Sequence, residues 1–491
     1  MSAAPKFEPI LRGRSHVYYG GAWQRANSGR EMEIVSPATG QALGIVAEGD
    51  ATDVDRAVAA AKAAFPAWRD MPARQRAELL REAGRIVRAN ADELTLIDAL
   101  DSGNPAKGMR YDVMLTADYF DYFAGLILEL KGHTLPLGPG VLNYTAKEPF
   151  GVVARIAAFN HPTLFVCGRV AAPLAAGNCV VVKPAEQTPI SAIRIAELLG
   201  PLFPPGVLNF VTGGREVGAA LVAHRDVSKV ALIGSIAAGR AVMRAAADTL
   251  KSLTLELGGK NAFIACGDAD PKAVAAAMVR GMNFTSVAGQ SCGSLSRVYL
   301  HEAIAAKVEA ALPEAMADLK VGMPTDPDAT VGSLSTVQQF DKTMDYIAIG
   351  KAEGARLIAG GKALRDGDFA KGYFVEPTVF AGVTDDMRLA REEVFGPILS
   401  LLTWRDEADV LARVNALDVG LTAAVWTKDI DRGHRIASRM EAGYVWINDV
   451  STHEIGMPFG GFKQSGFGKE EAFEELLGYT REKNIHLKFK M

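Results

Sequence analysis

Two stretches decide the fold of this chain: Leu253-Thr254-Leu255-Glu256-Leu257-Gly258-Gly259-Lys260 and, about one long helix later, Gly289-Gln290-Ser291-Cys292-Gly293-Ser294. The first places a carboxylate on a short apolar strand. The second places a cysteine in a segment rich in glycine and serine. Covalent catalysis by a thiol with a separate general base needs these two groups. Either stretch alone indicates little.

Cys292 is the best candidate nucleophile among the four cysteines. Cys167, Cys179 and Cys266 lie in apolar runs, where a thiol behaves as a small buried hydrophobic group. Glycines and small hydroxyl residues around Cys292 let a substrate approach closely and leave the sulfur accessible. Taken alone, a packed loop cysteine explains this segment equally well. For Glu256, a paired or solvated strand carboxylate is the simpler interpretation.

Length and composition exclude several classes of protein. A chain of 491 residues exceeds one hydrophobic core, so two or more domains are expected. The net charge of −4 gives no reason to expect nucleic acid or an anionic membrane as partner. The four cysteines form no CxxC pair, which disfavours a disulfide framework and a metal site and suits a reducing cytoplasm. Residues 1–14 lack the apolar region of a secretory signal, and the apolar region 152–182 is too interrupted to span a membrane.

The N-terminal part is predicted to begin with short strands within residues 17–48. A helix follows, with Thr52 as its N-cap and Asp55 three residues later. Further helices are expected over 73–90 and 91–100, where Ser102-Gly103-Asn104-Pro105 ends the pattern.

From Gly151 onward, short β-rich runs alternate with helical stretches, which predicts an α/β fold with a doubly wound parallel sheet. The expected strands are 152–157, 179–183, 208–212, 229–233 and 254–257, and the expected helices lie near 190–199, 216–223 and 237–250. A second unit of the same kind is expected, with strands 262–265, 297–301 and 444–447 and helices 271–283 and 302–318.

Ligands of parallel sheets bind at the carboxyl ends of the strands, where two segments draw attention. Lys183-Pro184-Ala185-Glu186 follows one strand; the pair is most simply solvent-facing, although a glutamate here can accept hydrogen bonds from ribose hydroxyls. Gly234-Ser235 leads into a helix whose free N–H groups offer a pyrophosphate site. No GxGxxG motif follows a strand, so a dinucleotide is only weakly indicated by these residues alone.

Four motifs in order resemble the NAD(P)-dependent aldehyde dehydrogenase superfamily, and the resemblance extends over essentially the whole chain. They are 255–260 (LELGGK), 289–292 (GQSC), 392–397 (EEVFGP) and 458–466 (PFGGFKQSG). The resemblance implies two Rossmann-like domains and a small β oligomerisation arm. The expected boundaries are 1–128 and 150–258 for the dinucleotide-binding domain, 259–464 for the catalytic domain, 465–477 for a connecting segment, and 129–149 with 478–491 for the oligomerisation strands.

The resemblance also implies the catalytic roles. Cys292 would attack the aldehyde, Glu256 would activate water, and Asn160 with the backbone amide of Cys292 would form an oxyanion hole. Glu470 matches a carboxylate implicated in proton relay, and Arg169 stands where many members have its lysine partner; an ordinary structural ion pair explains these two equally well.

NAD is the cofactor that the resemblance implies. Lys183 and Glu186 match contacts to the adenosine ribose, and Glu186 would repel a 2′-phosphate, so NAD is favoured over NADP. The remaining residues assigned to the cofactor are Gly213, Gly234, Ser235, Glu393 and Phe395.

The aldehyde itself is less determined. The positions matching the substrate tunnel are His161, Gly168, Ser291, Gly293, Ser451, His453 and Phe459. Few are aromatic, which disfavours a quaternary ammonium held by several rings. Gly168 is expected to make room for a broader group, and 282–285 (MNFT) resembles bacterial enzymes of aromatic-aldehyde catabolism, so an aromatic or bulky aldehyde is favoured. The spacing from Glu256 to Cys292 is longer than in many relatives, with an open effect on the loop before the nucleophile.

Three alternatives remain: a betaine- or aminoaldehyde dehydrogenase, a coenzyme A-acylating semialdehyde dehydrogenase, and a non-catalytic NAD-binding protein of the same fold. Glu256 opposes the second, because acylating relatives typically lack it. The intact set of Cys292, Glu256 and Asn160 opposes the third.

Two further strands are predicted at 141–147 and at the C-terminus, where Ile485, Leu487, Phe489 and Met491 alternate with polar residues. Their apolar face needs a covering surface, and the resemblance implies a homodimer or homotetramer. Packing against the chain's own domain is the alternative.

Overall fold

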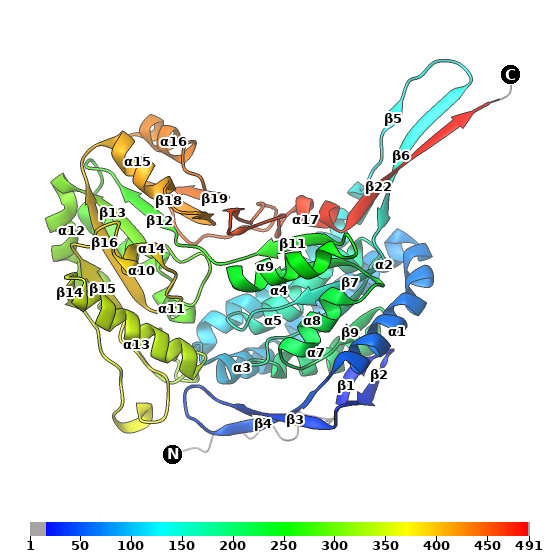
Figure 1. Ribbon diagram of the computed structural model, residues 1–491, viewed down its shortest axis with the longest axis horizontal. Coiled ribbons are helices and arrows are strands. Elements are labelled where there is room, and N and C mark those ends of the chain that lie inside the picture. The colour runs from blue at the N-terminus through cyan, green and yellow to red at the C-terminus, as the bar shows by residue number, and fades with distance from the viewer. Residues whose placement is uncertain (1–15, 490–491) are drawn as a thin grey trace.

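The computed structural model describes residues 16–489. The expectation for residues 1–14, and the last two positions of the predicted C-terminal strand, Lys490 and Met491, lie outside the described residues. Figure 1 shows two α/β halves side by side and a narrow β arm that projects from one of them. No helix in the described range is long and apolar enough to cross a membrane.

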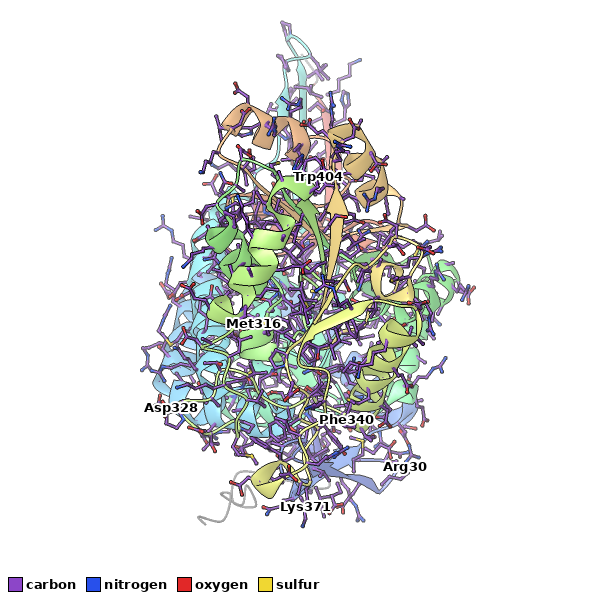
Figure 2. The ribbon with its side chains drawn as sticks, turned by 90° about the vertical axis from the view of Figure 1, so that its left-hand side faces the viewer. Arg30, Met316, Asp328, Phe340, Lys371 and Trp404 are labelled. Carbon is purple, nitrogen blue, oxygen red and sulfur yellow. The ribbon has the colours of Figure 1, made fainter. Side chains whose placement is uncertain are left out.

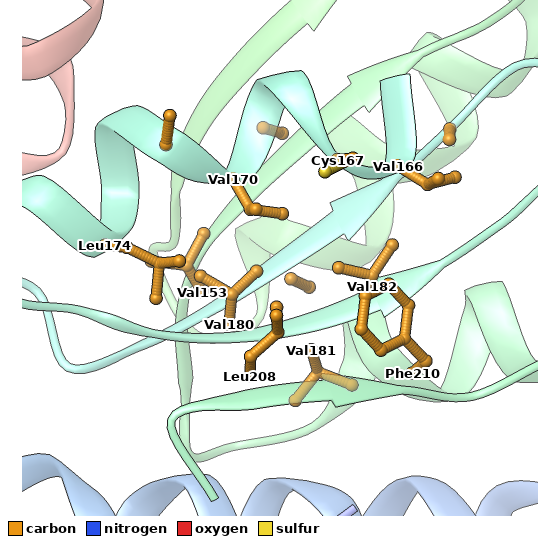
Figure 3. Packing of buried hydrophobic residues seen from close by; sticks show 14 of the residues in the cluster. Val153, Val166, Cys167, Val170, Leu174, Val180, Val181, Val182, Leu208 and Phe210 are labelled. Atoms are coloured by element: carbon orange, nitrogen blue, oxygen red, sulfur yellow. The ribbon is translucent and has the colours of Figure 1, made fainter. Parts of the chain in front are cut away.

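The first half is built on an eight-stranded sheet in the order β2-β1-β9-β8-β7-β10-β11-β21. Its strands are β1 (His16–Tyr19), β2 (Ala22–Arg25), β7 (Val152–Ile156), β8 (Cys179–Lys183), β9 (Leu208–Phe210), β10 (Val227–Ile233), β11 (Ser252–Glu256) and β21 (Gly466–Phe467). The five central strands are parallel, as predicted. They are rich in valine because helices cover both faces of such a sheet. Figure 3 shows Val180, Val182 and Leu208 packed beneath the segment that carries Val166 and Val170.

Helices surround this sheet: α1 (Ala51–Asp70), α2 (Ala73–Ala89), α3 (Ala91–Ser102), α4 (Ala106–Leu126), α5 (Pro162–Val166), α6 (Ala171–Ala175), α7 (Ile190–Leu199), α8 (Arg215–Ala223), α9 (Ile236–Ala247) and α17 (Phe473–Gly478). Short 3₁₀ turns lie at η1 (Ile127–Glu129), η2 (Gly168–Val170) and η3 (Gly200–Leu202). A separate hairpin joins β3 (Arg30–Val35) and β4 (Ala42–Glu48).

Two differences from the sequence analysis concern α1 and α4 in the first half. Thr52 is not the N-cap of α1: Asp50 accepts hydrogen bonds from the N–H groups of Thr52 and Asp53, and the Asp53 side chain accepts from Asp50 in return. Residues 50 and 53 fit the same capping signature as 52 and 55, so the pattern was displaced by two positions. Helix α4 was not predicted at all, although it packs in the main core.

The second half has a seven-stranded sheet in the order β14-β15-β16-β13-β12-β18-β19, parallel except at β14. Its elements are β12 (Ala262–Ala265), α10 (Pro271–Gly281), α11 (Phe284–Val287), β13 (Arg297–His301), α12 (Glu302–Ala315), α13 (Val337–Ala352), β14 (Arg356–Ala359), η4 (Gly367–Phe369), β15 (Thr378–Ala381), α14 (Arg388–Arg391), β16 (Ile398–Trp404), α15 (Glu407–Asn415), β18 (Thr422–Trp426), α16 (Ile430–Ala437) and β19 (Tyr444–Ile447). Trp404, labelled in Figure 2, donates its indole N–H to the carbonyls of Ala265 and Tyr299 and so ties β16 to β12 and β13.

The chain passes between the two halves twice, once after β11 and once before β21. Residues 257–261 lead from β11 into β12, and β21 returns to pair with the end of β11. The Ser465 hydroxyl donates to the Gly258 carbonyl at 2.9 Å and accepts from the Gly420 N–H at 3.0 Å. Nearby, β17 (Val419–Gly420) pairs with β20 (Phe462–Lys463). This junction positions the end of β11 opposite the second half.

The projecting arm consists of β5 (Thr134–Leu135), β6 (Val141–Pro149) and β22 (Thr480–Lys488). β6 and β22 pair antiparallel along their length, which confirms both predicted strands. Cross-strand partners share a face, so Leu142, Tyr144, Ile485 and Leu487 lie together. Leu487 is 45% exposed and Tyr144 is 36% exposed. The described residues of the chain therefore leave this face partly uncovered.

Candidate active site

Cys292 and Glu256 come together at the junction of the halves. Glu256 is the last residue of β11, is 3% exposed, and lies between Ile233 of β10 and Gly466 of β21. Cys292 lies on the loop before β13, where the Asn261 side chain donates to its backbone carbonyl at 2.6 Å. Both residues line the same cavity, of about 640 Å³.

The two side chains influence each other's pKa. Burial raises the pKa of the Cys292 thiol well above its usual value, and the charge of Glu256 and a hydrogen bond to it raise it further. Burial also raises the pKa of Glu256 well above its usual value, assisted by the nearby Glu470 charge. Glu256 Oε1 has no hydrogen-bond partner among the described residues. A buried carboxyl group with an open oxygen beside a thiol is suited to taking a proton from that thiol or from water.

The other three cysteines are buried away from this cavity. Burial raises the pKa of Cys179 to about 12 and that of Cys266 to about 11. None of them shares the setting of Cys292.

Most predicted substrate positions line the cavity: His161, Ser291, Gly293, Ser451, His453 and Phe459. Gly168 does not, although it was expected to widen the pocket. It is buried, and a Cβ there would lie 3.2 Å from Leu164 Cδ1 and 3.3 Å from Thr116 Oγ1. The missing side chain therefore makes room for Leu164. Asn160 is 2% exposed and lies beside His161; its backbone carbonyl accepts a hydrogen bond from Asn104, and the cavity lining does not include it.

Glu470 and Arg169 lie in contact, within a larger group of buried charges. Arg155 donates to Glu470 at 2.6 Å, and Arg169 Nε lies 3.3 Å from the other Glu470 oxygen. The shortest contact of Arg169 is with Glu471, at 2.7 Å, and Glu475 lies at 3.8 Å. Burial opposes ionisation of Glu470, but the two arginines outweigh it and lower its pKa.

Glu471 is a site residue that sequence reasoning missed. It accepts from Arg169 and contacts His453 Nδ1 at 3.2 Å, and it lines the cavity. Burial opposes its ionisation, yet His453 and Arg169 lower its pKa to about 2. The only feature of the sequence that could have pointed to Glu471 is its position next to Glu470.

Helix α4 contributes further missed residues, among them Tyr111, Asp112 and Leu115, and α5 contributes Leu164 and Phe165. Asp112 Oδ2 lies 2.7 Å from His161 Nδ1. The helical spacing of the buried residues Met109, Val113, Ala117, Phe120 and Ala124 was the signal that could have found α4.

The segment before Cys292 forms an irregular part of the cavity wall. Asn283, Ser286 and Ala288 have φ angles of 54°, 73° and 49°, which non-glycine residues rarely adopt. Thr285 and Ser286 line the cavity. A Cβ on Gly108 of α4 would lie 2.8 Å from Ser286 Cα, so only glycine permits this close contact.

The residues assigned to the cofactor follow the carboxyl ends of the first sheet's strands, or face them. Lys183 ends β8 and lies 3.5 Å from Glu186, whose side chain is 44% exposed. Ser235 caps α9, and the Gly234 N–H donates to the Glu256 carbonyl at 3.0 Å. Gly213 follows β9 with φ +146°, where a Cβ would lie 2.6 Å from Val217.

Glu393 and Phe395 come from the second half. Glu393 accepts from the Gly259 N–H at 3.0 Å, and burial raises its pKa. The Phe395 ring lies edge-on to Phe159, 5.8 Å between centroids. An accessible carboxylate, an open helix N-terminus and a close-approach glycine along one sheet edge fit a dinucleotide. Within residues 16–489, no group of three or more His, Cys, Asp or Glu is arranged to hold a metal ion.

Comparisons with known proteins assign the chain to a family. Residues 23–485 match the aldehyde dehydrogenase family. The chain is 45% identical to the aldehyde dehydrogenase tropH of Talaromyces stipitatus, over 99% of this chain and 96% of the relative. An NAD+ complex of aldehyde dehydrogenase from Bacillus cereus is 38% identical, with TM-score 0.95 and 99% of both chains covered. A complex of the P. syringae indole-3-acetaldehyde dehydrogenase AldA with NAD+ and IAA is 35% identical, with TM-score 0.94 and 98% and 97% of the chains covered. This chain belongs to the aldehyde dehydrogenase family.

Proposed function

We propose that the protein oxidises an aldehyde to the carboxylic acid with NAD, through a thiohemiacetal and then a thioester on Cys292. The observation that carries this proposal is the pairing of the Cys292 thiol with the buried carboxyl group of Glu256 in one cavity. The family of the chain, and the NAD+ complexes of its Bacillus cereus and P. syringae relatives, support the choice of cofactor.

In the first step the Cys292 sulfur attacks the carbonyl carbon after its proton has passed to Glu256 or to solvent. The developing oxyanion accepts hydrogen bonds from the Asn160 side-chain amide and the Cys292 backbone N–H. Bound NAD would supply the hydride acceptor that this oxidation needs, and the product of the oxidation is a thioester on Cys292. Glu256 then takes a proton from a water molecule that attacks the thioester, and the carboxylic acid and the free thiol are released.

Glu470 and Arg169 act behind Glu256 in this proposal. Arg155 and Arg169 hold Glu470 ionised, and its charge raises the pKa of Glu256. A raised pKa makes Glu256 a stronger base at the moment when it takes the proton from water.

For the cofactor, Lys183 and Glu186 would hold the adenosine ribose, and Ser235 with Gly213 and Gly234 would lie at the phosphates. Glu393 and Phe395 would hold the ribose on the nicotinamide side. The exposed Glu186 carboxylate would repel a 2′-phosphate, which favours NAD over NADP.

The proposal divides the chain by task. Residues 1–128 and 150–258 bind the dinucleotide, 259–464 carry the nucleophile, 465–477 connect them, and 129–149 with 478–491 form oligomerisation strands.

The proposed substrate is an aromatic or other bulky aldehyde. Besides Phe459, the cavity wall includes Tyr111, Leu115, Leu164 and Phe165, a set of side chains suited to a flat apolar ring. The relative from P. syringae is named for indole-3-acetaldehyde, which carries an aromatic ring.

The test is NADH formation with benzaldehyde, an aliphatic aldehyde and betaine aldehyde, each with NAD and with NADP. Wild type should turn over benzaldehyde with NAD, and Cys292→Ala should lose at least about 10³-fold in rate. Cys266→Ala, a matched loss of a thiol outside the cavity, should retain activity. Consumption of added coenzyme A would instead favour the acylating alternative. A wild type silent on every aldehyde, or an active Cys292→Ala, would refute the proposal.

A further inference from the structure

His161 is fixed in the cavity wall by a carboxylate from another helix. Its Nδ1 lies 2.7 Å from Asp112 Oδ2, and the Asp112 side chain is only 8% exposed. The ring also meets Phe165 edge-on, 5.4 Å between centroids. The pair joins α4 to the residue just before α5, so both elements set the orientation of the ring.

The other ring nitrogen of His161 is unused. Nε2 makes no hydrogen bond to any residue in the described range, and both His161 and Asp112 line the cavity. A carboxylate accepts hydrogen bonds, so the proton on Nδ1 is the one donated to Asp112. In the neutral ring this leaves a lone pair on Nε2. The ligand group that satisfies Nε2 is therefore a hydrogen-bond donor.

The charges around the cavity narrow the choice of donor. Arg169 lies within 4 Å of Glu470, Glu471 and Glu475, and these carboxylates balance its charge, although its Nε and Nη1 atoms make no hydrogen bond among the described residues. Lys107 also lines the cavity, but it is exposed at the surface. A hydroxyl group donates a hydrogen bond without bringing a charge into this half-buried site.

His453 is the second carboxylate-held histidine of the wall, but its setting differs. Its ring packs against Phe459 and Tyr444, at 4.9 and 5.9 Å between centroids. Its partner Glu471 is shared with Arg169. These contacts make His453 part of the packed wall. Among the described residues, the one aromatic ring in contact with His161 is that of Phe165.

We infer that His161 accepts a hydrogen bond from a hydroxyl group on the ring of the aldehyde, and that Asp112 is its positioning residue. The substrate class is thus a hydroxylated aromatic aldehyde. This inference rests on the proposed function and deepens it. His161 determines specificity and takes no part in the chemistry at Cys292.

The first experiment measures kcat and KM with NAD for benzaldehyde, 3- and 4-hydroxybenzaldehyde, 4-methoxybenzaldehyde and an aminoaldehyde. Wild type should prefer a hydroxybenzaldehyde over the unsubstituted and methoxy compounds by about tenfold in kcat/KM. His161→Phe should remove this preference, because KM for the hydroxy compound should rise about tenfold more than KM for benzaldehyde. Asp112→Leu should weaken the preference, because the ring is no longer held.

Two controls guard against a structural explanation. The double variant His161→Phe/Asp112→Leu leaves no unpaired carboxylate and should behave as His161→Phe does. His224 is another carboxylate-paired histidine: its Nε2 lies 3.2 Å from Asp55 Oδ1, and it does not line the cavity. His224→Gln should therefore keep the preference. Loss of the preference in His453→Phe but not in His161→Phe would overturn the assignment, as would a wild type that prefers the aminoaldehyde.

A binding measurement separates this inference from the proposed function. Calorimetry on Cys292→Ala should show 4-hydroxybenzaldehyde binding about tenfold more tightly than benzaldehyde, and equal binding once His161→Phe is added. If the wild type turned over none of the aldehydes, the proposed function would be refuted, but the difference in binding to Cys292→Ala would still test the role of His161. Turnover with equal binding of both compounds to Cys292→Ala would refute the inference alone.

Discussion

The Glu256 carboxyl group raises the pKa of the Cys292 thiol, although the two residues come from opposite halves of the molecule. The effect is mutual in part, because a hydrogen bond from Cys292 lowers the pKa of Glu256 against the larger effect of burial. The hydrogen bond between the two side chains gives the thiol proton a carboxylate oxygen to which it can pass. Both the attack on the aldehyde and the hydrolysis of the thioester then depend on where that proton goes.

Replacing Glu256 with glutamine should separate these two steps. The steady-state rate should fall by about 10²–10⁴-fold, because no base activates water against the thioester. One equivalent of NADH per active site should still form in the first turnover. Rapid mixing measures that burst, and intact-protein mass spectrometry should find the acyl group on Cys292. An undiminished steady-state rate would show that Glu256 is not the hydrolytic base.

Thiol alkylation tests the pKa relationship directly. The charge of Glu256 raises the pKa of Cys292, so its removal in Glu256→Gln should move the midpoint of the alkylation pH profile of Cys292 to lower pH. Iodoacetamide labelling, followed by peptide mass spectrometry, gives the rate at each pH. Cys266 is 0% exposed, so it should stay unlabelled in both proteins, which checks that the fold remains intact. A midpoint that moves upward would mean that Glu256 mainly acts as the acceptor of the thiol proton.

The five central strands of the first sheet and three strands of the second could be predicted, because their signal is local. Strand β8 (Cys179–Lys183) begins with four consecutive apolar residues. Such a run is typical of a strand that is buried on both faces of its sheet. The motif residues Glu256 and Cys292 could likewise be recognised, since each motif is contiguous in sequence. Helix α4 escaped prediction even though its buried residues keep helical spacing, and the Asp112 and Tyr111 positions were missed with it.

Contacts between distant residues left no sequence signal. Arg169 and Glu471 are 302 positions apart, and nothing local distinguishes Glu471 from its neighbour Glu470. The space beside Gly168 was misjudged for the same reason, since Leu164 and Thr116 fill it only after folding. Local chemistry therefore identified the reacting groups, while the shape of the cavity required the structure.

Glu471 should make stability depend on acid pH. Its folded pKa of about 2 is lower than that of an unfolded glutamate, so its stabilisation is present above about pH 4.3 and is lost as pH falls toward 2. Glu471→Gln should reduce the free energy of unfolding by about 3 kcal/mol near neutral pH, and the difference should shrink as pH falls. Urea unfolding at about pH 7 and about pH 4 measures both values.

The control for Glu471 is Glu82→Gln, which removes an exposed carboxylate paired with Arg85. Solvent screens that pair, so neither stability nor its pH dependence should change appreciably. A difference between wild type and Glu471→Gln that stays constant with pH would contradict the assignment of the low pKa to Glu471.

Glu186 should control the choice between NAD and NADP. Glu186→Gln keeps the shape of the side chain but removes the charge that repels a 2′-phosphate, so kcat/KM with NADP relative to NAD should rise by about tenfold. Initial rates with both cofactors at saturating aldehyde give this ratio. Glu302→Gln, which removes an exposed carboxylate of the other half, should leave it unchanged. An unaltered ratio in Glu186→Gln would assign cofactor discrimination elsewhere.

The arm should assemble copies of this chain. One face of the β6–β22 ribbon is formed by Leu142, Tyr144, Ile485 and Leu487. An apolar face that stays partly exposed is a typical interaction surface. Wild type should be a homodimer or homotetramer in size-exclusion chromatography with light scattering, measured over a range of concentrations. Leu487→Asp should shift it toward monomer, because a carboxylate would be buried in the contact. His486→Asp places the same charge on the opposite face and should keep the wild-type mass. A monomeric wild type, or an unchanged mass in Leu487→Asp, would leave the arm without a role in assembly.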